Sequence, residues 1–85
     1  MSKMKRKEAV TLPPDPEGMN DDRAEWANAA IKEFMRVCRT DEEDAPGDLI
    51  ADIMHWCDRK GIDPIATLER AKSHYQEETL NIEGE

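Results

Sequence analysis

Four side chains of the 85-residue sequence could bind a soft metal or activate a nucleophile: Cys38, His55, Cys57 and His74. Structural zinc sites usually take their ligands from two pairs with roughly two to four residues between the partners, and no pair here has that spacing. His55 and Cys57 are two positions apart, so on a helix they point about 160° away from each other. We therefore predict no cofactor and expect both cysteines to be reduced thiols packed in the core.

Carboxylates one helical turn apart raise a second chemical alternative. Asp48 and Asp52 are separated by one turn, and Asp52 and His55 form a D-x-x-H step. Di-iron bundles use such a step, but they take it from two helices and add further glutamates. A small metal-dependent enzyme that uses Asp48, Asp52 and His55 is therefore an alternative hypothesis. The preferred interpretation is the solvent-exposed side of a helix in a protein that is not an enzyme.

The charge of the chain favours a partner with a basic surface. The sequence holds 20 acidic and 12 basic residues, which gives a net charge of −8. Direct nucleic-acid binding is disfavoured, because it relies on Lys and Arg to neutralise phosphates. The exception is the basic run from Lys3 to Lys7. A nucleic-acid-associated regulator that uses this tail, together with Lys32, Arg36 and Arg39, is a further alternative.

Apolar residues spaced by three and four positions predict an all-α fold. The first helix should begin at Asn20, Asp21 or Asp22, each of which can cap free backbone N–H groups, and should fade near Arg39. The second should run from Gly47 or Asp48 to Lys60. Gly61 suits the left-handed backbone conformation that follows a helix.

A third helix is predicted to follow at once, with Asp63 as N-cap and Pro64 as its first residue. Short connectors favour a small three-helix bundle in which neighbouring helices are roughly antiparallel. We expect residues 1–19 to form a disordered basic and proline-rich lead, residues 20–79 the three-helix domain, and residues 80–85 a frayed acidic tail.

The location of the protein can also be predicted. The basic N-terminus has no apolar segment behind it and therefore does not match a secretory signal peptide. No apolar run approaches the roughly 20 residues that span a bilayer. We expect a cytoplasmic protein with no membrane partner.

The remaining candidates for function would form a protein-binding surface. Trp56 lies at the edge of the apolar stripe of the second helix, and aromatic residues bordered by charge are frequent binding hot spots. Self-association as a homodimer is a further expectation, because a small core leaves apolar surface exposed. The residues expected at the binding surface are Glu42, Glu43, Asp48, Asp52, His55, Trp56 and Tyr75.

The segment from Asp48 to Tyr75 contains the runs L-I-A-D-I-M-H-W-C-D and A-K-S-H-Y. In these runs the chain resembles a group of small bacterial and phage-type helical proteins. The resemblance implies an all-helical accessory protein of phage or mobile-element origin. It brings no known activity, so it transfers no catalytic or binding residue. Together with the acidic charge, it favours a protein that binds a basic surface of a host protein, for example as an anti-CRISPR-like inhibitor.

Overall fold

Three helices form the computed structural model, which describes residues 11–80. Helix α1 spans Asn20–Cys38, α2 spans Ala45–Lys60 and α3 spans Pro64–Glu78. No strand occurs within the described residues. The prediction of an all-α, three-helix fold is confirmed. None of the helices in residues 11–80 combines the length and the apolar character that crossing a membrane would require.

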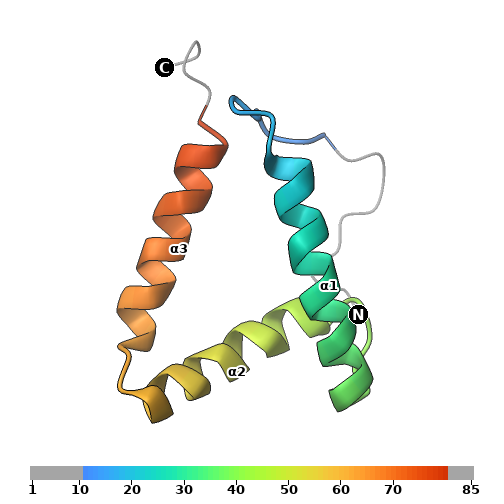
Figure 1. Cartoon of the computed structure of the whole chain (residues 1–85), viewed down its shortest axis with the longest axis vertical. Helices are drawn as coiled ribbons and strands as arrows, with labels where there is room; N and C mark the ends of the chain where they lie inside the picture. Colours follow the sequence, from blue (N-terminus) through green and yellow to red (C-terminus); the bar gives the residue numbers. More distant parts are fainter. Residues whose placement is uncertain (1–10, 81–85) are drawn as a thin grey trace.

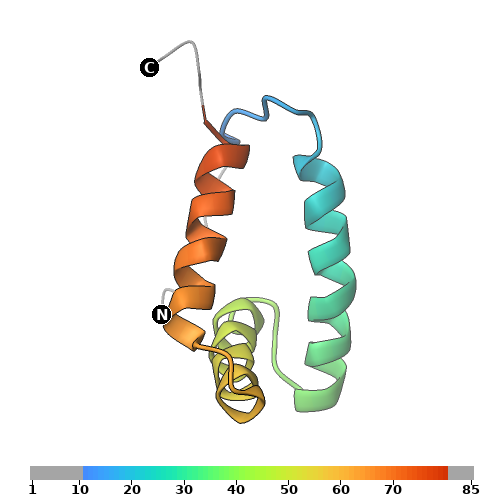
Figure 2. The same ribbon diagram turned by 60° about the vertical axis from the view of Figure 1, so that its left-hand side comes forward.

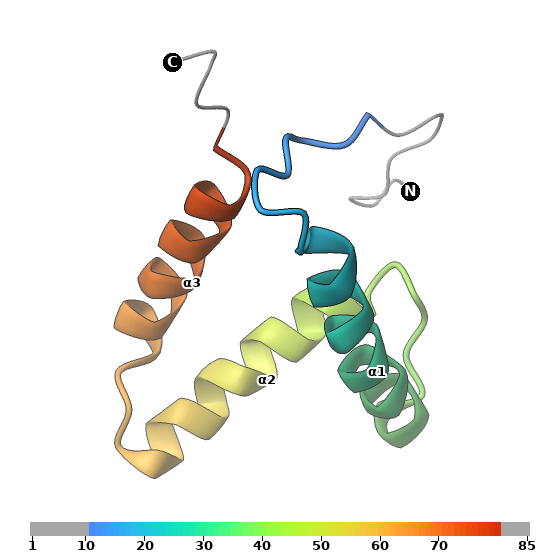
Figure 3. The same cartoon turned by 45° about the horizontal axis from the view of Figure 1, so that its top comes forward.

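The helices are arranged as an open triangle. In Figure 1, the start of α1 lies near the end of α3, and α2 crosses the opposite ends of both. The turned views in Figures 2 and 3 keep this arrangement. Helices α1 and α3 run in opposite directions, but α2 lies across them. The expectation that consecutive helices pack antiparallel is therefore wrong.

The positions of the two buried residues explain this shape. Among the described residues only Ala45 and Cys57 are buried, and they lie near opposite ends of α2. Twelve residue steps along a helix correspond to about 18 Å. Packed helix axes are only about 8–10 Å apart. Because α1 joins α2 at the Ala45 end and α3 leaves it at the Cys57 end, α1 and α3 lie too far apart there to pack against each other.

The ends of α2 and α3 follow their local sequence signals as predicted. The Asp63 carboxylate accepts hydrogen bonds from the backbone N–H groups of Ile65 (2.9 Å) and Ala66 (3.1 Å), and α3 begins at Pro64. Gly61 has a φ angle of 75°, and the N–H of Ile62 donates to the carbonyl of Cys57 at 2.9 Å. This is the bonding pattern of a Schellman cap. Helix α2 begins at Ala45, slightly before the expected start.

The start of α1 differs from the prediction. The N-cap position is Met19, which has no capping side chain, and the Asp15 carboxylate accepts bonds from the N–H groups of Gly18 (3.0 Å) and Asn20 (3.3 Å) instead. A turn from Asp15 to Gly18 brings this carboxylate to the end of the helix. Among the described residues, the hydrogen bonds that hold the start of α1 therefore reach back to Asp15. Residues 1–10 of the expected lead, with the Lys3–Lys7 run, and residues 81–85 of the expected tail lie outside the described residues.

The two cysteines have different environments. Cys57 is buried, as predicted, but Cys38 is exposed, and neither forms a disulfide. Cys38 is the last residue of α1 and has no neighbouring helix over it, so its placement in the core was wrong. The apolar stripe of α1 instead contributes the half-buried Ile31, Phe34 and Met35.

Two glycines, Gly47 inside α2 and Gly61 directly after it, test the role of backbone conformation. A Cβ added at Gly61 or at Gly47 would meet no atom within 4 Å, so packing does not distinguish the two positions. Gly61→Ala places a side chain at positive φ and should lower the free energy of unfolding by about 1 kcal/mol. Gly47→Ala, inside the helix, should raise it by about 0.5 kcal/mol. Urea denaturation followed by circular dichroism measures both, and changes of the same sign would contradict this account.

Candidate functional site

One face of α2 brings together three of the predicted binding residues. Asp48, Asp52 and His55 are all exposed. Steps of four and three residues separate their side chains by only about 40–60° around the helix axis. We call these three residues the acidic face of α2. Arg59 donates to the His55 carbonyl at 3.1 Å, which lays one guanidinium group along the helix beside this face.

Two further predicted residues, Glu42 and Glu43, are exposed in the connector that leads into α2. The connector is held by a hydrogen bond from the N–H of Asp44 to the Asp41 carboxylate at 2.9 Å. Acidic side chains at this position lie near the positive end of the α2 dipole, which stabilises them. The acidic connector therefore leads directly into the helix that carries the acidic face.

Trp56 borders the acidic face, because it follows Asp52 by one helical turn. Its side chain is 56% exposed. The Lys60 ammonium lies 5.6 Å from the centroid of the indole ring, within the range of a cation–π interaction. Lys60 therefore helps to hold the indole in place while leaving more than half of it accessible to a partner.

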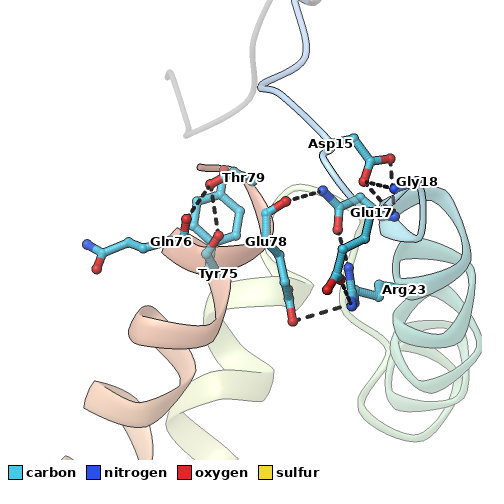
Figure 4. Close-up of polar contacts among 9 residues, drawn as sticks. Asp15, Glu17, Gly18, Arg23, Tyr75, Gln76, Glu78 and Thr79 are labelled. Carbon is cyan, nitrogen blue, oxygen red and sulfur yellow. Dashed lines mark hydrogen bonds and ion pairs between the residues drawn. The ribbon is translucent and has the colours of Figure 1, made fainter. Parts of the chain in front are cut away.

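Tyr75 belongs to a different part of the molecule. It lies in the last turns of α3, about 16 Å along the helix from the α2 end. Its side chain is 58% exposed, and its carbonyl accepts a bond from the Thr79 hydroxyl at 2.8 Å (Figure 4). The predicted surface thus divides into an α2 group and an isolated tyrosine.

A polar cluster that the sequence did not predict closes the third corner of the triangle (Figure 4). The Arg23 guanidinium donates to Asn20 Oδ1 at 2.7 Å and to Glu17 Oε1 at 2.9 Å, and it lies 3.5 Å from Glu78 Oε2. The Asn20 amide donates to the Glu78 carbonyl at 2.9 Å. We call Glu17, Asn20, Arg23 and Glu78 the Arg23 clasp. A partial signal was present in D-P-E-G, whose Asp, Pro and Gly suit a type I turn.

The Arg23 clasp is electrostatically satisfied. The hydrogen bond to Glu17, aided by the charge of Glu78, raises the pKa of Arg23. A groove of about 440 Å³ lies beside the clasp and is lined partly by Leu12, Pro13 and Tyr75. Because two carboxylates already engage the guanidinium, it is not free to bind an anionic ligand in this groove. The contacts of Asn20 and Arg23 with Glu78 instead connect α1 to α3.

The positions of the side chains can be compared with the two alternative hypotheses, a metal-dependent enzyme and a nucleic-acid-associated regulator. Among residues 11–80, no three His, Cys, Asp or Glu side chains gather in a way that could hold a metal ion. Asp48, Asp52 and His55 share a helix face without forming such a group. Of the basic residues considered for nucleic acid, Arg36 is paired with Glu33 through two hydrogen bonds, and this contact lowers the pKa of Glu33.

Two arginines of α1 provide a matched test of the clasp. Arg23→Met removes the ion pair with Glu78 that connects α1 to α3, together with the pair to Glu17 before α1, whereas Arg36→Met removes a pair within one helix. Arg23→Met should lower the urea midpoint clearly and speed amide exchange at the start of α1 and the end of α3. Arg36→Met should change the midpoint little, because exposed pairs within a helix contribute little stability. Equal effects of the two substitutions would argue against a connecting role for the clasp.

Comparisons with protein-family models, with curated proteins and with solved structures find no match for this chain. The similarity to small phage-type helical proteins therefore stays a prediction from sequence. A function has to be inferred from the surface of the molecule itself. Its most distinctive chemical feature is the acidic face of α2 with Trp56 at its border.

Proposed function

We propose that this protein acts by binding another protein, and that the acidic face of α2 docks on a basic surface of that partner. The observation that carries the proposal is the combination of Asp48 and Asp52, exposed on one helix face, with the half-exposed Trp56 beside them. Exposed tryptophans next to charged groups are typical anchors of protein interfaces. The proposed role is binding and not catalysis.

The two kinds of side chain would contribute differently to binding. The carboxylates of the acidic face, together with Glu42 and Glu43, give a negative potential that speeds encounter with a positive surface and selects against negative ones. Trp56 supplies apolar contact area at the border of the charged region. The Lys60 ammonium, 5.6 Å from the indole centroid, would favour one orientation of the ring and so reduce the side-chain entropy lost on binding.

A protein that binds nucleic acid has the complementary chemistry, because its basic groove is built to hold phosphates. Carboxylates on a rigid helix would occupy such a groove. The resemblance to phage-type accessory proteins supports the same proposal, with an inhibitor of a host nucleic-acid-binding machine, such as an anti-CRISPR-like protein, as its specific form. On this proposal the protein works inside the cell, where such a partner is found.

Affinity capture with charge-reversed variants tests the proposal. The bait is the full chain, either unchanged or carrying Asp48→Lys and Asp52→Lys, and the prey is a lysate of the native host. The matched control carries Glu69→Lys and Glu77→Lys, which change the net charge equally but lie on α3. We expect the unchanged chain and the control to retain the same basic protein, and the α2 variant to lose it by about 10-fold or more.

Salt and the aromatic residue give two further readouts. Capture should weaken as the ionic strength rises from about 0.1 to 0.5 M, because screening shortens the range of the acidic potential. Trp56→Ala should weaken binding by about 10-fold while the salt dependence persists. Undiminished capture by the Asp48→Lys, Asp52→Lys bait would show that another surface binds.

A further inference from the structure

The groove beside the Arg23 clasp has the character of a binding site. Its volume is about 440 Å³, and its apolar lining includes Leu12, Pro13, Ala24 and the ring of Tyr75. Leu12 is 71% exposed and Tyr75 is 58% exposed, so both offer apolar surface to an occupant. Ligand sites in proteins are usually about 300–1,000 Å³, mostly apolar, with a few polar groups. The size and the lining of this groove agree with that description.

The charged residues at this corner favour a basic occupant. Asp15, Asp21 and Glu78 line the groove. The lining also contains Arg23, but its guanidinium already donates to Glu17 and lies 3.5 Å from Glu78. With Glu17 included, four carboxylates and one guanidinium give this corner a net charge of −3. The corner therefore repels anions and attracts cations.

Two segments of this chain lie outside the described residues, and both join it beside the groove. Residues 81–85 follow Thr79 and Leu80, and residues 1–10 precede Thr11 and Leu12. Residues 81–85 hold two glutamates and no basic residue, so the acidic corner would repel them. Residues 1–10 hold one glutamate and four basic residues, which gives a net charge of +3. Charge therefore favours residues 1–10 as the occupant. Their basic residues are Lys3, Lys5, Arg6 and Lys7.

The length of the chain allows this segment to reach the groove. Lys7 lies four residues before Thr11, and Thr11 is next to a residue of the groove wall. An extended chain covers at most about 3.3–3.6 Å per residue, so Lys7 can lie anywhere within about 14 Å of Thr11. Long basic side chains can lay their apolar stems along an aromatic ring while their charged ends reach nearby carboxylates. Tyr75 and Glu78 offer such a combination (Figure 4).

We propose that the basic segment Lys3–Lys7 of this chain docks in the groove beside the Arg23 clasp. Its charged groups pair with the carboxylates of the corner, and its side-chain stems cover the Tyr75 ring. The docked segment adds to the connection that Asn20 and Arg23 make between α1 and α3. The corner lies opposite α2 (Figure 1), so the acidic face of α2 stays available to a foreign partner.

The covalent connection makes this contact effective even when the local affinity is weak. A short tether gives an effective concentration of about 1 mM. A local dissociation constant of about 0.1 mM would then keep the groove about 90% occupied, which slows access to Tyr75 by about 10-fold.

Nitration of Tyr75 by tetranitromethane, an uncharged reagent, tests the proposal on the full chain. The sequence holds a single tyrosine, so the reaction reports on this groove. We expect nitration of the unchanged chain to be about 10-fold slower than nitration of a chain with Lys5→Glu and Arg6→Glu. The matched control carries Lys32→Glu and Arg70→Glu, which change the net charge equally at exposed positions of α1 and α3, and it should react as slowly as the unchanged chain. Equal rates in the unchanged and the Lys5→Glu, Arg6→Glu chains would overturn the proposal.

Two other occupants give different results in the same assay. A segment of the same chain protects Tyr75 equally at all protein concentrations between about 1 and 100 µM. Protection that increases with concentration would identify a second copy of the chain as the occupant. Protection that disappears when residues 81–85 are removed would identify that segment instead. Either result would overturn the proposal.

Carbodiimide cross-linking of the unchanged chain locates the contact without any substitution. The reagent joins an amine to a neighbouring carboxylate as an amide, and mass spectrometry of peptides identifies the pair. We expect the lysines of Lys3–Lys7 to be joined chiefly to Asp21, Glu17 or Glu78 within one chain. The yield should fall by about 3-fold or more between about 0.05 and 0.5 M salt, because screening weakens exposed ion pairs. Cross-links chiefly to the acidic connector or to the acidic face of α2 would overturn the assignment to the groove.

Discussion

The distance between two contacts on one helix governs the architecture of this protein. α2 is covered near Ala45 at one end and near Cys57 at the other, and these points lie farther apart than two packed helices can span. α1 and α3 therefore diverge where they meet α2 and approach each other only at their far ends. At that third corner the contact between the start of α1 and the end of α3 is polar. It consists of the hydrogen bonds and ion pairs of the Arg23 clasp. The open triangle follows from this geometry.

The same geometry leaves two different surfaces of α2 exposed. One side carries Asp48, Asp52 and His55, which are all exposed. The opposite side carries Ile50 and Ile53, which a compact bundle would bury. The acidic side, with Trp56 at its border, is the surface proposed to bind another protein.

The candidate site was predictable where it depends on a single helix. Asp48, Asp52 and His55 share a face because of helical periodicity alone, and the exposure of Trp56 followed from its place at the edge of the apolar stripe. Tyr75 lies apart from them on α3, and the sequence could not show this separation because it depends on the direction of α3. The Arg23 clasp was missed for the same reason. Asn20 and Glu78 are 58 positions apart, and no local pattern pairs them.

The sequence by itself determined the helices and most of their ends, because capping is decided by a few neighbouring residues. Asp63 and Pro64 start α3, and Gly61 ends α2, through backbone conformations and hydrogen bonds that span no more than one turn. Only the tertiary structure decided how the helices cross and that Cys38 is exposed while Cys57 is buried. These features depend on the distance between the contacts near Ala45 and Cys57 on α2. An apolar stripe in the sequence shows that a helix face can be covered, but it does not show what covers that face.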